Sequence, residues 1–166
     1  MSAQIWSARD VKDNILAKLN VTSSSESRYP GLAYYITAIN TERSETTPIP
    51  AQITSGVDNG GLPCVFVDLG DSTFNETRAN DWTVLRETLQ LQVTSKIKAG
   101  DMVTLDKYCE TYLEGILRTL TGYSEDGGNG KTFECIPTET ARIDITSDKQ
   151  GMQKLVGVLF NVERNF

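Results

Sequence analysis

The chain contains no histidine among its 166 residues. That absence excludes the serine, cysteine and acid–base mechanisms that depend on imidazole, and it removes the commonest metal ligand. The sequence also lacks any run of about 18 apolar residues, so we expect no membrane-spanning helix. The opening segment, Met1–Trp6, has no basic region followed by an apolar core, which predicts no secretory signal.

Basic residues and closely spaced cysteines are also scarce. Lys and Arg number 16 against 22 Asp and Glu, which gives a net charge of −6. Tight, sequence-independent binding to a phosphate backbone needs clustered cations and is therefore not expected. The cysteines Cys64, Cys109 and Cys135 are odd in number and far apart, unlike a disulfide framework or a zinc site. They are interpreted as reduced, buried thiols of a protein made in the cytosol.

Two amphipathic helices are predicted by the spacing of apolar residues. Near residues 8–20, Val11, Ile15 and Leu19 form one apolar stripe, with Ser7 as the expected N-cap and Trp6 packing before it. The stronger pattern covers residues 104–121, where apolar side chains recur at steps of three and four and Gly122 can close the helix. Its members are Leu105, Tyr108, Cys109, Tyr112, Leu113, Ile116, Leu117 and Leu120.

Strands are predicted where β-prone residues cluster or alternate with polar ones. In the long segment Thr83–Ile97 one parity is apolar, and only Glu87 interrupts that inward row. The other predicted strands are Leu32–Ile39, Leu62–Leu69, one interrupted strand over Phe133–Ile136 and Arg142–Thr146, and Lys154–Arg164, with a hairpin excursion also open at Ala51–Thr54. The polar connections Asn40–Gly61, Gly70–Asp81 and Tyr123–Thr132 are interpreted as loops.

This order of elements predicts an α+β fold in a single domain, residues 1–166. Consecutive strands without a helix between them favour antiparallel pairing. We therefore expect a mixed, mostly antiparallel sheet of about five strands, with the two amphipathic helices packed on one face.

The segment Gly127–Thr132 ends like a phosphate-binding loop, but that motif requires a glycine where Glu125 stands. It also leads into a predicted strand, whereas phosphate binding uses the amides at a helix N-terminus. A hairpin-type loop is the better interpretation.

Three acidic residues near strand ends, Asp68, Asp71 and Asp81, are candidates for a carboxylate pair or a Mg²⁺ site. Nothing in their spacing fixes two of them at a working distance, and acidic loop residues are usually solvated. Cys109 lies on the apolar stripe of the second helix and has no histidine to activate it. Trp6 and Trp82 are interpreted as core or interface anchors. We therefore predict no catalytic, cofactor-binding or metal-binding residue.

The segment from Glu42 to Asp81 holds seven acidic residues and two basic ones, and so carries nearly the whole net charge. Ordinary solubility explains such a segment, as does a surface that faces an anionic environment without binding it. Long loops, an acidic middle and no catalytic set favour a protein that works by shape and contact.

The pattern and order of these elements resemble the tail terminator (tail completion) proteins of tailed bacteriophages. The resemblance spans nearly the whole chain and contains no diagnostic short motif. It rests on Val11–Leu19, Leu62–Leu69, Leu85–Ile97, Leu105–Leu120 and Lys154–Arg164.

The resemblance implies a structural virion protein without catalytic residues or cofactors, made in the host bacterial cytoplasm. Such a protein forms a hexameric ring on a completed tail tube, stops the addition of tube subunits and offers a docking surface to the head connector. Its partners would be its own copies, the tail tube protein and the head–tail connector, with DNA only passing through the lumen and no membrane involved. The alternatives are another neck or tail component, such as a connector or tube subunit, a carboxylate-dependent hydrolase using Asp68 or Asp71, and an adaptor that binds a peptide on a sheet edge.

Overall fold

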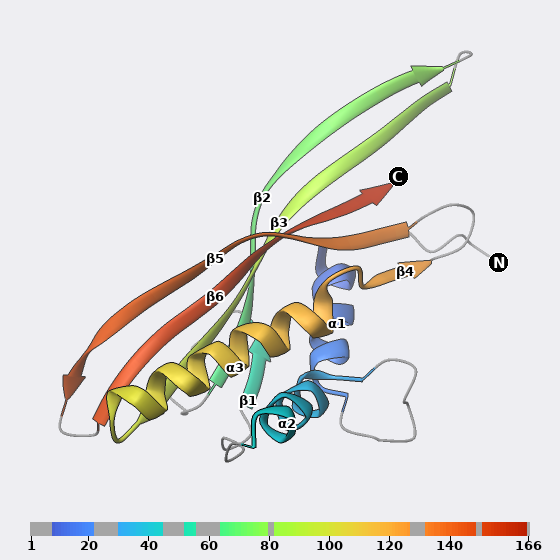
Figure 1. Ribbon diagram of the computed structural model, residues 1–166. Coiled ribbons are helices and arrows are strands. Elements are labelled where there is room, and N and C mark those ends of the chain that lie inside the picture. Colours follow the sequence, from blue (N-terminus) through green and yellow to red (C-terminus); the bar gives the residue numbers. More distant parts are fainter. Residues whose placement is uncertain are drawn as a thin grey trace.

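The computed structural model describes residues 8–21, 30–44, 52–55, 64–79, 82–126, 132–148 and 151–165. Within these ranges the protein has an α+β fold, as predicted (Figure 1). Its elements in chain order are α1 (Ala8–Leu19), α2 (Leu32–Arg43), β1 (Gln52–Ser55), β2 (Cys64–Ala79), β3 (Trp82–Ala99), α3 (Met102–Leu120), β4 (Ser124–Asp126), β5 (Thr132–Asp148) and β6 (Gly151–Asn165).

The strands form one six-stranded sheet in the order β1-β2-β3-β6-β5-β4. Four long strands, β2, β3, β6 and β5, make its centre and alternate in direction, while short β1 and β4 lie at the two edges. All pairs are antiparallel except β1 with β2. The sheet is therefore mixed and mostly antiparallel, as expected, with one strand more than the predicted number.

The core lies between one face of this sheet and the helices. The inward row of β3, which includes Leu89, Leu91 and Val93, is buried against α3, which lies across β3 and β6. The apolar stripe of α3 is buried as predicted, and so is the stripe of α1. The expected N-cap of α1, Ser7, and Trp6, which is expected to pack before it, lie outside the described residues.

The ends of α3 show why this helix begins and ends where it does. The Asp101 side chain accepts a hydrogen bond from the Thr104 backbone N–H at 2.8 Å, which caps the N-terminus. Gly122, two residues beyond the helix, has a φ of 73°, a conformation that side chains rarely adopt, in agreement with its predicted role.

The prediction of a strand over Leu32–Ile39 is wrong, because this segment forms the first part of α2. Its buried residues, Leu32, Ile36 and Ile39, recur at helical steps, and Leu32 and Ile36 pack on α3 beside Gly115. The β-prone side chains favour a strand, but their packing against α3 outweighs this intrinsic preference and stabilises a helix. The protein therefore has three helices in its described part instead of two.

The interpretation of Gly70–Asp81 as a loop is also wrong. β2 continues to Ala79 and pairs with β3 up to the Ala79–Trp82 pair, with one irregularity between Leu69 and Ser72. The resulting β2–β3 arm projects away from the helices (Figure 1). Its sequence is polar because a ribbon outside the core has no apolar partner to cover it.

Two smaller differences concern short strands. Residues 52–55 form β1, which pairs in parallel with β2, so the excursion considered at Ala51–Thr54 is not an antiparallel hairpin. At the other edge, Ser124–Asp126 pairs with Thr132–Glu134, which agrees with a hairpin-type connection at the glycine-rich segment. The glycines of that connection, Gly127, Gly128 and Gly130, lie outside the described residues.

Candidate interaction surfaces

A buried polar network fixes the root of the β2–β3 arm. The Arg164 guanidinium on β6 donates a 2.6 Å hydrogen bond to the Glu87 carboxylate on β3, and the Ser72 hydroxyl on β2 donates to the same carboxylate at 3.0 Å. Glu87 is the residue that interrupts the inward row of β3, and its side chain does point inward. The network therefore ties three strands together at the level where the arm leaves the helices.

A row of acidic residues runs along the exposed side of α3 at four-residue steps, and each carboxylate meets a cation from another element. Asp106 pairs with Lys154 of β6, Glu110 with Arg142 of β5, and Glu114 with Arg43 of α2. The contact distances are 3.1, 2.7 and 2.8 Å, respectively. These pairs fasten α3 to both the sheet and α2, a role that the sequence pattern did not reveal.

Hydrogen bonds to arginine shift the pKa of Glu110 in this row and of Arg118 beside it. The Arg142 guanidinium hydrogen-bonds Glu110 and lowers the pKa of that carboxyl below its usual value. The pKa of Arg118 is raised because Glu42 accepts hydrogen bonds from its guanidinium, and Glu114 also attracts the positive charge. The Glu110 carboxylate is therefore ionised at neutral pH.

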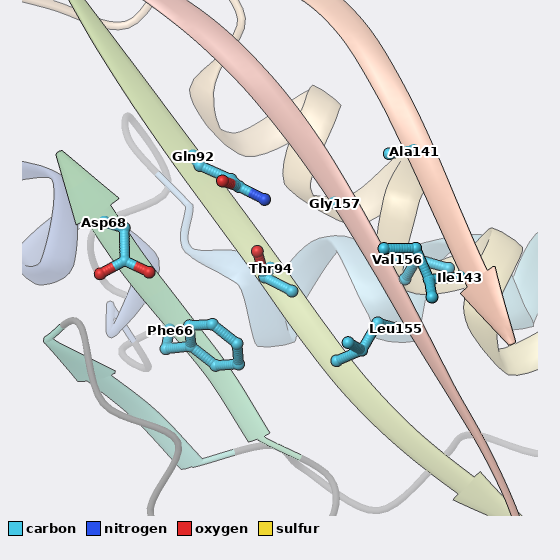
Figure 2. Close-up of a pocket in the computed structure, with 9 residues that line it drawn as sticks. All are labelled: Phe66, Asp68, Gln92, Thr94, Ala141, Ile143, Leu155, Val156 and Gly157. Carbon is cyan, nitrogen blue, oxygen red and sulfur yellow. The ribbon is translucent and has the colours of Figure 1, made fainter. Parts of the chain in front are cut away.

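The opposite face of the sheet carries no described helix, and its middle contains a shallow hollow of about 180 Å³ (Figure 2). Small-molecule sites usually enclose about 300–1,000 Å³, so this hollow suits a side chain better than a substrate. It is lined by Phe66, Asp68, Gln92, Thr94, Ala141, Ile143, Leu155, Val156 and Gly157.

Of the three carboxylates that the sequence suggests as a possible pair or metal site, Asp68 and Asp71 are described by the structure. Asp68 lines the hollow, and among the described residues it is the only carboxylate there. Asp71 is exposed at the β2 irregularity, and Asp81 lies outside the described residues. The described residues contain no group of three or more metal-ligating side chains.

The other residues singled out from the sequence have structural positions. Cys64, Cys109 and Cys135 are buried and form no disulfide, and burial raises the pKa of the Cys135 thiol to about 12. A thiol with that pKa is protonated at neutral pH and is a poor nucleophile. Trp6, and the side chain of Trp82, lie outside the described residues.

The described acidic residues of the segment from Glu42 to Asp81 lie on different parts of the protein. Glu42 faces Arg118 on α3, Asp68 lies on the helix-free face, and Asp71 is exposed where the arm begins. Several of its other members lie outside the described residues. Within the described residues, no helix is long and apolar enough to cross a membrane.

The fold is of the α+β class, with a long, twisted sheet covered by helices on one face. No protein-family model and no curated protein sequence matches the chain. Among solved structures, the fold is similar to that of a chain in the virion of a native gene transfer agent (GTA) particle. The match has a TM-score of 0.50 and 10% sequence identity, and it covers 92% of each chain. At this identity the comparison shows a shared fold.

Proposed function

We propose that this chain is a structural virion protein of a phage-type particle, a tail terminator that forms a ring on the end of the tail tube. In this role it stops the addition of tube subunits and offers a docking surface to the head connector. The observation that carries the proposal is the fold shared over 92% of both chains with a component of a GTA virion. The resemblance in element order to tail terminator proteins supports the same function independently.

The character of the surfaces supports a role based on contact rather than chemistry. The hollow on the helix-free face is too small for an ordinary substrate and has one described carboxylate. In the middle of that face, Thr88, Gln90 and Gln92 of β3 are uncharged, and Lys96 and Lys98 follow in the same row toward one end of the strand. A DNA molecule crossing the middle of the face would therefore meet uncharged β3 side chains there. We propose accordingly that the protein is not an enzyme and binds DNA only in transit.

A ring requires heterologous contacts, in which one surface of a copy meets a different surface of the next copy and the rotation closes. We propose a hexamer for this ring, one face of which fits the last ring of the tube. The other face of the ring lacks the surface on which a further tube ring would grow. In the infected cell the protein would be made in the bacterial cytoplasm and incorporated at the neck of the virion.

The decisive experiment adds the purified protein to its cognate tube protein during polymerisation, and tube lengths are measured by negative-stain electron microscopy. A terminator shortens the tubes in proportion to its concentration and appears as an extra ring at one end. Tube lengths that do not change with the amount of protein added would overturn the proposal.

The same experiment separates the alternatives. Another tube subunit would add to the tubes instead of arresting them, and a head–tail connector would bind finished ends without changing tube length. A hydrolase using Asp68 or Asp71 would turn over a substrate in a broad screen and lose that activity in Asp68→Asn or Asp71→Asn without loss of folding.

A further inference from the structure

Among the described residues, the short strands β1 and β4 cover only part of each edge of the sheet. At one edge, β1 pairs with β2 over Cys64–Val67, and from Asp68 to Ala79 no other described strand pairs with the outer side of β2. At the opposite edge, β4 pairs with β5 over Thr132–Glu134, and from Pro137 to Asp148 the outer side of β5 is likewise uncovered by described strands. Uncovered edges present rows of backbone N–H and C=O groups that pair readily with another chain.

We propose that copies of this protein join by pairing the uncovered edge of β2 in one copy with the uncovered edge of β5 in the next. This inference rests on the ring of the proposed function and names the surface that builds it. Each copy has one edge of each kind, on opposite sides of the sheet, so every contact repeats the same head-to-tail relationship.

The strand directions fit this junction. β2, β3, β6 and β5 alternate in direction along the sheet, so β5 runs opposite to β2. When copies are related by rotation about an axis that the strands broadly follow, each copy keeps the same sense along it. The β5 of one copy then meets the β2 of the next antiparallel, and the alternation continues across the junction without interruption.

The register within one copy sets how the neighbours must be staggered. Thr73 on β2 is level with Thr88 on β3, whereas Glu139 and Ala141 on β5 are level with Gln92 and Thr94, respectively. Bringing Thr73 of one copy opposite Glu139 or Ala141 of the next therefore shifts the copies by about four or six residues along the strands. An odd shift is excluded because it would place inward side chains of one copy beside outward side chains of the other.

These staggers agree with the geometry of closed sheets. Four strands are about 19 Å wide, and four to six residues span about 13–20 Å, so the strands would incline to the ring axis by roughly 35–45°. That range is typical of closed β-barrels. Six copies would contribute about 24 long strands, and barrels of about 16–18 strands already enclose a water-filled channel. The helices would lie outside, and the helix-free face would line the channel.

The backbone groups available for pairing can be assigned from the β4–β5 ladder. The N–H and C=O of Cys135 bond Tyr123 and Gly122, so both groups of Cys135 point to the outer edge. Cys135 and Thr140 pair with Val162 and Val158 of β6, which are four residues apart, so Thr140 also directs its N–H outward. The N–H groups of Glu139 and Ala141 then point inward, that is, toward β6 in the same copy. By the same alternation across β6 and β3, the N–H of Thr73 points toward β3.

Disulfide trapping tests the junction directly. Thr73, Glu139 and Ala141 are exposed. Residues that face each other across the junction with their N–H groups pointing away from it form non-hydrogen-bonded pairs. Their Cα atoms are about 4.5 Å apart, a distance that a disulfide can bridge. The double variants Thr73→Cys/Glu139→Cys and Thr73→Cys/Ala141→Cys are assembled on tubes and oxidised mildly. The native cysteines are buried and serve as an unreactive background.

The expected result is a ladder of cross-linked species up to a closed hexamer in one of the two double variants. The single variants Thr73→Cys, Glu139→Cys and Ala141→Cys are the controls and should give no ladder. If electron microscopy shows rings on tubes but neither double variant cross-links, edge pairing is wrong and the proposed function stands. If no ring forms at all, the proposed function fails and the inference fails with it.

A second pair of variants tests the backbone contribution. Thr140→Pro removes the outward N–H of an exposed edge residue, where proline is tolerated, and Thr140→Ala keeps that N–H while shortening the side chain. We expect ring assembly by the proline variant to weaken at least about tenfold, with the monomer still folded by circular dichroism. Equal assembly of the two variants would overturn the inference.

Discussion

The guanidinium of Arg164 and the carboxylate of Glu87 lie 2.6 Å apart, with side chains that are 8% and 3% exposed. The two residues are 77 positions apart in the sequence, on neighbouring strands β6 and β3. A charge removed from water in this way is stabilised only while its partner is present. The pair thus couples the end of β6 to the root of the β2–β3 arm.

Removing one member of this pair should be costly. Glu87→Leu leaves Arg164 buried without its carboxylate, and we expect the free energy of unfolding to fall by about 3–5 kcal/mol. Urea denaturation followed by circular dichroism measures the change. The double variant Glu87→Leu/Arg164→Leu removes both charges and should regain a large part of the lost stability. If the single and double variants were equally unstable, the contact would be a packing effect and not a charge pair.

The position of Glu87 was predictable from the sequence, but its partner was not. The alternation of β3 placed Glu87 in the inward row, because a period of two is visible within a single strand. The partner, Arg164, was not predicted, because the order of strands in the sheet cannot be derived from local pattern. The cations that pair with Asp106, Glu110 and Glu114 were not predicted for the same reason, because they lie on elements distant along the chain. Arg118, which also pairs with Glu114, is the exception because it lies on α3 itself.

The two wrong assignments have one physical origin. The composition of Leu32–Ile39 predicts a strand, and that of Gly70–Asp81 predicts a loop. In the first segment packing on α3 overrides the local preference, and in the second pairing with β3 does so. The helices around Val11–Leu19 and Leu105–Leu120 were predicted correctly, since their buried stripes are long enough to dominate. The candidate surfaces on the sheet edges required the pairing of β1 and β4 and were beyond sequence reasoning.

Gly115 controls the approach of α2 to α3. A Cβ at this position would lie 3.0 Å from Leu32 Cδ1 and 3.2 Å from Ile36 Cγ1, so a larger side chain must push the helices apart. We expect Gly115→Leu to lower the free energy of unfolding by about 1–3 kcal/mol through overpacking. Thermal denaturation provides the measurement.

Shortening the facing residue gives the matched control for this contact. In Gly115→Leu/Leu32→Ala the added side chain occupies space that Leu32 vacates, so part of the lost stability should return. If the two changes were simply additive, Gly115 would not owe its small size to the contact with α2.

The Glu110–Arg142 pair predicts a specific dependence on pH. The folded pKa of Glu110 is lowered by the hydrogen bond from Arg142, so the folded state binds this proton less readily than the unfolded chain. The stabilisation is therefore fully present above the unfolded pKa and is lost as pH falls through the lower folded value. Both side chains are about half exposed, which limits the contribution to about 0.2–1 kcal/mol.

Comparison of the wild type with Arg142→Met isolates this pair from the other carboxylates. Unfolding is measured at pH 7 and at several values below pH 4.5, in low salt. The stability difference between the two proteins should shrink on acidification. A difference that stayed constant with pH would show that Arg142 acts through its aliphatic stem, without the charge of Glu110.

The hydroxyl of Ser95 is a buried polar group in the core. Ser95 is fully buried in the inward row of β3, between Val65 and Val156 on the neighbouring strands, and within the described residues its Oγ makes no hydrogen bond. A buried hydroxyl without a partner costs free energy, so Ser95→Ala should raise the free energy of unfolding by about 1 kcal/mol. The control is Thr119→Val, which removes a buried hydroxyl that donates to the Gly115 carbonyl at 2.7 Å and should lower stability instead. Urea denaturation of both variants decides the question, and a loss of stability in Ser95→Ala would mean that this hydroxyl has a partner in the folded protein.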